Sequence, residues 1–215
     1  LHNRRVVELL QEKPDPPVFL NRDGNRLLLH DRRALEIEDA GLVVGCYFGT
    51  GLGNAICIGG EMLVGRNGVA GELGHIPLPG NTRRCGCGNI GCMETVASGR
   101  YLKELQTLHF PEDDLADLFT RYSRTHVLRE YVEGLSIPVA TEINLVDPDY
   151  VVLGGGVLYR RDFPMDLLVE CIRRHTRQPL PLDNMEIVFS QPRQQSGVIG
   201  AGIYAFGQIK KEVVA

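Results

Sequence analysis

The chain has 215 residues, of which 43% are hydrophobic and 23% are charged, with a formal net charge of −4 at pH 7. This length is enough for one sizeable domain with a buried core. No apolar run is long enough to span a bilayer, and the charge balance lacks the basic excess typical of nucleic-acid binding. Because LHNRRVVELL shows no signal-peptide pattern, we expect a cytoplasmic protein.

Helical and β-rich patterns alternate along the chain, which predicts an α/β fold. Apolar residues follow a helical spacing over 1–12, and NRDGN reads as a turn ahead of a helix over 26–35. Residues 41–60 form two β-rich runs joined by GTGLG, the pattern of a hairpin with a glycine turn that 60–64 extends. Further helices are expected over 102–110, 113–122, 127–146, 163–175 and 196–209, and strands over 147–153 and 185–192.

Three of the six cysteines lie close together, in the run Cys85, Cys87 and Cys92. Without a secretory signal a disulfide framework is a weak expectation. The glycines around the sulfurs allow a tight turn, and His75 stands ten residues upstream as a fourth ligand. The spacing therefore predicts a tetrahedral zinc site, with three free thiols as the alternative. The other cysteines stand in apolar surroundings and are expected to be buried: Cys46, Cys57 and Cys171.

Two glycine-rich loops are candidates for phosphate or nucleotide binding. GTGLG at 49–53 offers consecutive backbone N–H groups and a hydroxyl, which suits an anion. GGG at 154–156 follows a buried strand, where a ligand can approach the backbone closely. Neither loop is a Walker motif because no GK[ST] follows, and glycine hairpins often bind nothing.

Five motifs in order make the chain resemble the ROK family of sugar kinases and sugar-responsive repressors. They are NRDGN, GTGLG, GVAGELGH, C-x-C-x4-C-x-E and VVLGGGV, and the resemblance covers about residue 17 to residue 205. The spacing between His75 and Cys85 is its most specific part. The arginine of NRDGN and the segments AGELGHIPL, INLVDPDYVVLGGGV and RQPLP are most similar to the bacterial D-allose kinases of the family.

This resemblance implies an actin-like, ribonuclease-H-like ATPase fold and roles for single residues. Asp23 matches the catalytic aspartate, which takes the proton of a sugar hydroxyl as that oxygen attacks the γ-phosphate of ATP. Without its neighbouring motifs Asp23 would read as a turn-capping residue. The expected sugar ligands are Glu72, His75 and Glu94. Arg22 stands where relatives acting on glucose-like sugars carry Asn, so it is expected to influence sugar choice, unless it points to solvent or to a phosphate.

The resemblance also implies Mg-ATP and a structural zinc ion. The phosphates would lie on Gly49, Thr50 and Gly51, and the adenosine on Gly154, Gly155 and Gly156. Zinc on His75, Cys85, Cys87 and Cys92 would fix His75 and Glu94 around the sugar. The expected partners are a hexose, ATP and a second copy of the chain in a homodimer.

One family motif has no match in this chain. Actin-like kinases carry an Asp-Gly-Gly-Thr type phosphate loop at the start of their first lobe, and the sequence lacks one. We therefore expect residues 1–38 to be the remnant of an N-terminal lobe, 39–205 the C-terminal lobe with its zinc loop, and 206–215 a tail. With half of the phosphate cradle absent, the fragment alone is expected to be inactive.

Three functions fit these motifs. A hexose kinase uses both the aspartate and the glycine loops. A repressor would carry DNA-reading helices upstream of this chain, and only in that case is nucleic acid an expected partner. A zinc-stabilised sugar-binding domain would need no catalysis. The arginine pairs carry no motif and are expected to be solvated: 32–33, 83–84, 160–161 and 173–174.

Overall fold

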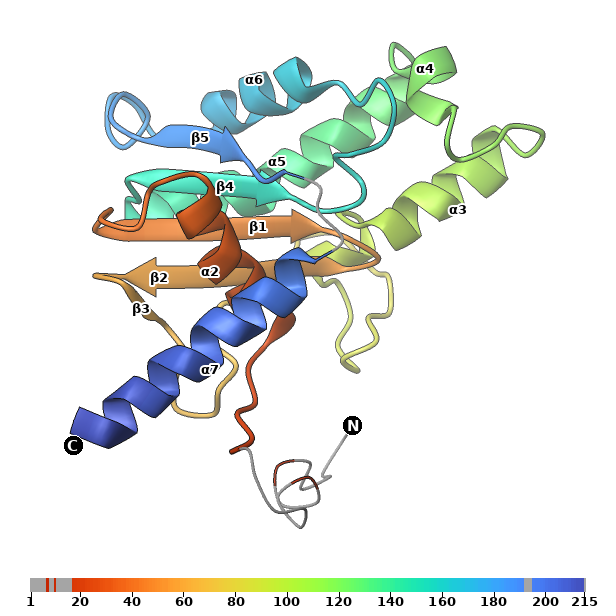
Figure 1. The fold of residues 1–215 in the computed structure, drawn as a ribbon. Helices are drawn as coiled ribbons and strands as arrows, with labels where there is room; N and C mark the ends of the chain where they lie inside the picture. The colour runs from red at the N-terminus through yellow and green to blue at the C-terminus, as the bar shows by residue number, and fades with distance from the viewer. Residues whose placement is uncertain (1–6, 8–9, 11–16, 192–194, 215) are drawn as a thin grey trace.

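A computed structural model describes residues 7, 10, 17–191 and 195–214, with side chains described as far as residue 210. A central sheet carries helices on both faces (Figure 1), so the predicted α/β class is confirmed. The helix expected over 1–12 falls outside the described residues except at two positions. In the described part of the chain, no helix is both long and apolar enough to cross a membrane.

The sheet is mixed, with the strand order β3-β2-β1-β4-β5. Strand β1 pairs antiparallel with β2 and parallel with β4, while β3 and β5 form the two edges. The predicted glycine hairpin is confirmed, because Phe48 at the end of β1 faces Leu52 at the start of β2. The strands are β1 Leu42–Phe48, β2 Leu52–Ile58, β3 Glu61–Met62, β4 Tyr150–Gly154 and β5 Glu186–Phe189.

Both faces of the sheet are buried, which explains the continuous apolar runs of its central strands. Val44, Cys46 and Phe48 of β1 enter the core beneath helices α5 and α6, while Val43 and Tyr47 face α2. Figure 1 shows α5 and α6 behind the sheet and α2 and α7 in front of it. The bounds are α2 Asp23–Ala34, α5 His126–Val146, α6 Met165–His175 and α7 Ser196–Val214.

Helix α2 begins earlier than the sequence suggests. Asp23 is its first residue and Arg22 its N-cap, with extended backbone angles of φ −71° and ψ 152°, so the turn predicted for NRDGN is wrong. A carboxylate in the first turn interacts favourably with the helix dipole, which compensates for Gly24 as a weak helix former. As a result Asp23 stands at a helix start instead of a loop tip.

The bounds of helices α3, α4 and α7 can be compared with those predicted from the sequence. Helix α3, expected over 102–110, spans Gly99–His109 and so begins three residues earlier. Helix α4 covers only Leu118–Tyr122, because the Asp114 carboxylate accepts the Ala116 N–H at 2.7 Å and so competes with a helical turn. Helix α7 continues without a break past residue 206, so the expected tail is helical as far as Val214.

Candidate active site

The start of α2 is tied to the loop that carries the expected sugar ligands. The Arg22 guanidinium lies 2.8 Å from Glu72 Oε1 and also donates to the Ala70 carbonyl oxygen. Asp23 follows directly, with a side chain that is 88% exposed and paired with Arg26. The predicted base and one predicted sugar ligand are therefore joined through Arg22, which points neither to bulk solvent nor to the glycine hairpin.

The start of α2 and the loop around Gly71 both pack against Asn54 of β2. A Cβ on Gly24 would lie 2.7 Å from the Asn54 carbonyl oxygen, and a Cβ on Gly71 would lie 2.6 Å from its Oδ1. Gly71 also has φ +76°, which favours glycine on its own account. The Asn54 amide in turn donates to the Gly45 carbonyl at 3.0 Å and to Glu142 Oε2 at 2.7 Å. Glycine is thus required where the two segments approach the sheet.

Glu142 is a buried carboxyl that the sequence motifs do not reveal. It is 3% exposed, on α5 behind the sheet. Burial raises the pKa of Glu142 to about 7, although hydrogen bonds from Asn54 and Cys46 act in the opposite direction. The Cys46 thiol donates to the same oxygen at 3.3 Å, and burial together with Glu142 raises the pKa of Cys46 well above its usual value.

Residues 70–75, which carry the expected ligands Glu72 and His75, form the sugar loop. Glu94 connects this sugar loop with the glycine hairpin at 49–53. It lies in the short 3-10 helix Met93–Thr95, and its Oε2 accepts the Leu52 N–H at 3.0 Å. A Cβ on Gly51 would lie 2.2 Å from the same oxygen, and one on Gly74 would lie 3.3 Å from Glu94 Cβ. Glu94 therefore lies between the two loops, with its carboxylate next to the predicted phosphate loop and its Cβ next to the predicted sugar loop.

A cavity of about 650 Å³ opens beside the glycine hairpin. The start of α3 holds the hairpin in place, since the Gly99 N–H donates to Gly49 O at 2.8 Å and the Arg100 N–H to Thr50 O at 3.1 Å. Gly49, Thr50 and Gly156 line the cavity, which brings the two predicted nucleotide loops together.

The three glycines after β4 have different surroundings. Only Gly156 lines the cavity. Gly155 has φ +101°, and a Cβ there would lie 2.5 Å from backbone atoms of Phe48. A Cβ on Gly154 would lie 2.9 Å from Ser190 Cβ. Gly154 and Gly155 thus allow close packing of the chain, whereas Gly156 faces the space that a ligand could occupy.

Three cations line the same cavity and were missed by the sequence reading: Arg100, Lys103 and Arg160. Two belong to α3, and Arg160 also donates to the Leu115 carbonyl at 3.2 Å, so the expectation that pair 160–161 is solvated is wrong for its first member. No motif marks these side chains, because helix α3 and the segment after β4 meet only in the fold.

The predicted zinc ligands converge. The ligand atoms of His75, Cys85, Cys87 and Cys92 all lie within 4.8 Å of one another. Cys85 Sγ is 3.5 Å from His75 Nδ1, and Cys87 Sγ is 3.6 Å from Cys92 Sγ. A tetrahedral zinc ion with bonds of about 2.3 Å to sulfur and about 2.0 Å to nitrogen spaces its ligands by roughly 3.5–3.8 Å. The donor set and its spacing fit zinc.

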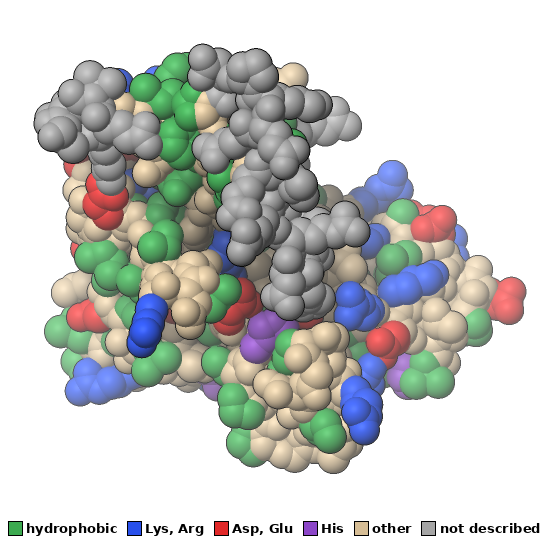
Figure 2. All heavy atoms as spheres, turned by 90° about the horizontal axis from the view of Figure 1, so that it is seen from below, with side chains coloured by type: hydrophobic (Ala, Val, Ile, Leu, Met, Phe, Trp, Pro, Cys, Tyr) green, Lys and Arg blue, Asp and Glu red, His purple; other side chains and the backbone are tan. Residues whose placement is uncertain are grey.

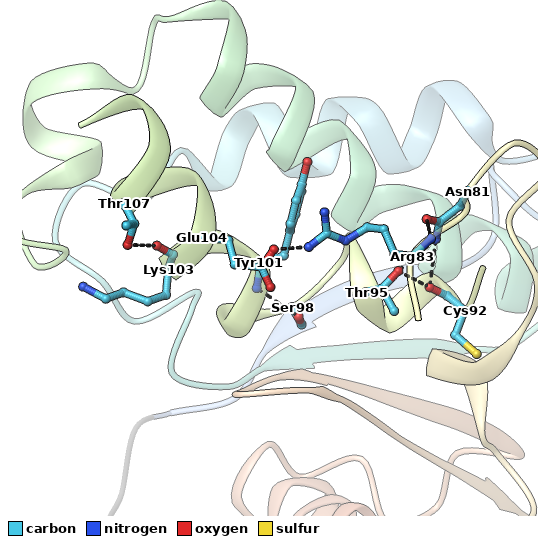
Figure 3. A network of polar contacts seen from close by, with 9 residues as sticks. All are labelled: Asn81, Arg83, Cys92, Thr95, Ser98, Tyr101, Lys103, Glu104 and Thr107. Atoms are coloured by element: carbon cyan, nitrogen blue, oxygen red, sulfur yellow. Dashed lines mark hydrogen bonds and ion pairs between the residues drawn. The ribbon is translucent and has the colours of Figure 1, made fainter. Parts of the chain in front are cut away.

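Polar contacts anchor this cysteine loop to the 3-10 helix Met93–Thr95 and to α3 (Figure 3). Asn81 donates to the Cys92 carbonyl at 3.2 Å and to Thr95 Oγ1 at 2.9 Å. Arg83 pairs with Glu104 of α3 and lies 4.9 Å from the centre of the Tyr101 ring. Arg83 is therefore a structural link between the cysteine loop and α3, and the expectation that it is simply solvated is wrong.

The face seen from below carries mixed charge. Basic and acidic side chains are interspersed on it, with apolar side chains between them (Figure 2). The visible part of this face agrees with the small net charge of the chain.

Comparisons with known proteins assign the chain to a family. The ROK family profile matches residues 2–207, so the chain belongs to the ROK family. An N-acetyl-D-glucosamine kinase of Escherichia coli O6:H1 is 33% identical over 190 residues, which are 80% of this chain and 61% of that protein. The chain thus spans less than two thirds of the length of such curated relatives.

Solved structures of the family include kinases and a regulator. The ROK hexokinase from Thermus thermophilus matches with a TM-score of 0.81 and 28% identity, over 96% of this chain and 70% of that one. A ROK family transcriptional regulator, a homolog of E. coli MLC, matches with a TM-score of 0.75 and 25% identity, over 91% of this chain and 53% of that one. The expected actin-like fold, which ROK kinases share, is confirmed.

Proposed function

We propose that this chain provides the sugar-binding side and part of the nucleotide-binding side of a kinase that phosphorylates a hexose with ATP. The observation that carries the proposal is the position of Glu94, whose carboxylate lies next to Gly51 of the phosphate loop and whose Cβ lies next to Gly74 of the sugar loop. Phosphoryl transfer requires the sugar hydroxyl and the γ-phosphate to meet, so ligands for both must converge at one place.

In this proposal each charged group has a distinct task. Asp23 accepts the proton of the attacking hydroxyl, and its exposed position at the start of α2 leaves it accessible to a sugar. Glu72, His75 and Glu94 bind the other hydroxyls. The cations of the cavity, Arg100, Lys103 and Arg160, neutralise the phosphates beside Thr50 and Gly156. Mg²⁺ bound with ATP would add to this neutralisation.

Zinc has a structural part in the proposal. His75, Cys85, Cys87 and Cys92 would hold it as a closed four-ligand site, which supplies a rigid cross-link between the sugar loop and the cysteine loop. Glu94 follows Cys92 by two residues, so the cross-link also limits the movement of this sugar ligand.

The choice of sugar rests on Arg22 and on the relatives. Because of the resemblance to allose kinases, we propose D-allose as the substrate. Arg22 would hydrogen-bond the inverted hydroxyl at carbon 3 that distinguishes allose from glucose. The contact between Arg22 and Glu72 supports this role, because the guanidinium lies next to a carboxylate that we propose binds the sugar. The relative named an N-acetyl-D-glucosamine kinase makes that sugar the main competitor.

A sugar-responsive repressor is the second candidate, supported by the structural likeness to the MLC homolog. The complete hairpin, the cavity beside it and Asp23 favour the kinase, because a sensor of sugar alone has no use for phosphate ligands. A segment with DxGxT ahead of this chain would indicate a kinase, whereas a helix-turn-helix would indicate a repressor.

The test is an ATP-consumption assay on the complete protein with allose, glucose and N-acetylglucosamine. We expect phosphorylation of at least one sugar, and Asp23→Asn should lower turnover by roughly 10²–10⁴-fold, the usual contribution of a positioned general base. Sugar binding should persist in that variant. If no sugar is phosphorylated, the repressor function is favoured instead. Near-normal turnover of Asp23→Asn would contradict the proposed role of Asp23 as the general base.

A further inference from the structure

The two ring nitrogens of His75 face different partners. Nδ1 lies 3.5 Å from Cys85 Sγ, inside the cluster of metal ligands. Nε2 points away from the cluster and lies 3.5 Å from Glu72 Oε2. The ring therefore stands between a metal site on one side and a carboxylate on the other.

The Glu72 carboxylate is itself held in place. Arg22 binds its Oε1 at 2.8 Å, which leaves Oε2 to face His75. Glu72 precedes the 3-10 helix Leu73–His75, so a single short turn sets the distance between the carboxylate and the ring. The His75 N–H donates to the Glu72 carbonyl at 2.9 Å, which fixes this turn.

We propose that Glu72 is a positioning residue for the metal in addition to its expected role as a sugar ligand. Its carboxylate lies beside the Nε2 edge of the His75 ring, which favours the tautomer with the proton on Nε2 and leaves the Nδ1 lone pair free to bind zinc. A carboxylate behind a histidine ligand also strengthens the ligand by raising its basicity. The inference rests on the proposed zinc site and gives Glu72 a function that does not depend on catalysis.

The series of contacts from Arg22 through Glu72 and His75 to zinc would couple the sugar site to the metal site. A sugar hydroxyl that donates to Glu72 draws on the same negative charge that stabilises His75, so sugar and metal act on one carboxylate. Energetic coupling between two ligands is reciprocal. In the proposed kinase the cysteine loop therefore responds to sugar binding, beyond serving as a fixed support.

Zinc affinity, measured by competition with a chromogenic chelator on the 215-residue chain, tests the inference. Glu72→Gln should weaken zinc binding by about 10–100-fold, the usual effect of removing such a carboxylate. The matched control is Glu104→Gln. Its side chain is similarly exposed, 48% against 43%, and pairs with Arg83 next to the cysteine loop, but it does not contact His75. The control should keep the affinity of the wild-type chain.

A second readout separates positioning from a general loss of structure. In the zinc-loaded chain, ¹⁵N NMR should report His75 protonated at Nε2, and this signal should change in Glu72→Gln while the rest of the spectrum stays. Equal zinc affinity of Glu72→Gln and Glu104→Gln, or a wild-type chain that binds no zinc, would overturn the inference. Neither measurement uses sugar or ATP, so a failed kinase assay would leave the result unchanged.

Discussion

Arg22 reaches from the start of α2 to the Glu72 carboxylate, where it can shape the proposed sugar site. Arginine offers only donors in a long fork, whereas the asparagine of glucose-specific relatives offers a donor and an acceptor. We expect Arg22→Asn to change the ratio of kcat/KM for allose over glucose by about 10-fold or more, the size of one hydrogen bond to a charged group. Steady-state kinetics of the complete protein on both sugars measure this ratio.

Arg33→Asn is the control for that prediction, because Arg33 lies at the exposed end of the same helix. It should leave the ratio of the two sugars unchanged. If Arg22→Asn also leaves the ratio unchanged, the sugar is read by Glu72, His75 and Glu94 without Arg22. A wild-type protein that prefers glucose or N-acetylglucosamine would refute the allose assignment itself.

Glu142 should make stability depend on pH. Its pKa is raised from 4.5 to about 7, so the folded protein binds more protons than the unfolded chain between these values. The stability contributed by the neutral carboxyl is therefore present below pH 4.5 and is lost as the pH rises through 7. The free energy of unfolding of Glu142→Gln minus that of wild type should therefore increase by about 3 kcal/mol as the pH rises from 4 to 8.

Urea unfolding of both proteins across this pH range measures the difference. The exposed Glu130→Gln on the same helix is the control and should show little of this trend. If the difference in free energy of unfolding between Glu142→Gln and wild type does not change with pH, the hydrogen bonds from Asn54 and Cys46 stabilise the charged carboxylate enough to offset its burial.

Residues with a motif could be predicted, and residues without one could not. Spacing alone placed His75, Cys85, Cys87 and Cys92 in one cluster, because loop glycines leave few ways to arrange close sulfurs. Glu142 and the cations of the cavity could not be found, since what makes them unusual is a neighbour far away in the sequence. Asn54 is 88 residues from its partner Glu142.

Among the elements, the contact between α2 and α7 depends on one glycine. A Cβ on Gly200 would lie 1.8 Å from the Arg26 carbonyl oxygen, so α2 and α7 could not stay this close. We expect Gly200→Ala to lower the free energy of unfolding by about 1–3 kcal/mol, as overpacking usually does. Gly202→Ala is the matched control, since nothing lies within 4 Å of a Cβ there, and it should stabilise the helix by about 0.5–1 kcal/mol. Thermal or urea unfolding compares them, and equal effects would contradict the packing described here.

The cysteine loop should lose its metal when one ligand is removed. Cys87 is the exposed ligand, so Cys87→Ser leaves the core undisturbed while it removes one of four donors. The wild-type chain should carry about one zinc per chain by metal analysis, and the variant clearly less, because structural sites use a closed set of four ligands. Asn89→Ser in the same loop is the control and should retain zinc. Metal-free wild-type protein would favour three free thiols.

Element types followed from apolar periodicity, whereas element ends often did not. Strand β1 and helix α5 were expected within one or two residues of their observed bounds. The start of α2 was missed because R-D-G-N favours a turn locally, while packing against the sheet and α7 favours a helix. Helix α4 was overestimated because aspartates within an apolar pattern can bond their own backbone instead.

The central sheet brings the loops of the proposed site to one end of the molecule. Strands β1 and β4 run parallel, so the hairpin after β1 and the glycines after β4 leave the sheet on the same side. In parallel sheets this carboxyl end is where ligands commonly bind. The sugar loop and cysteine loop reach the same region through Glu94, which contacts the hairpin. The architecture therefore explains why motifs far apart in sequence form one site.

The 215-residue chain produced alone should keep its zinc but transfer no phosphate. Its cavity is lined by the hairpin, α3 and the segment after β4, which we propose hold the phosphates, while the chain lacks the Asp-Gly-Gly-Thr type loop of actin-like kinases. With ligands on one side only, ATP should bind weakly and no phosphate should reach a sugar, because in-line transfer needs both reactants held in place. Zinc binding should persist, since all four ligands belong to the chain. Calorimetry with ATP, a coupled kinase assay and metal analysis of the same sample check this combination. Robust sugar phosphorylation by residues 1–215 would show that the chain holds ATP without that loop.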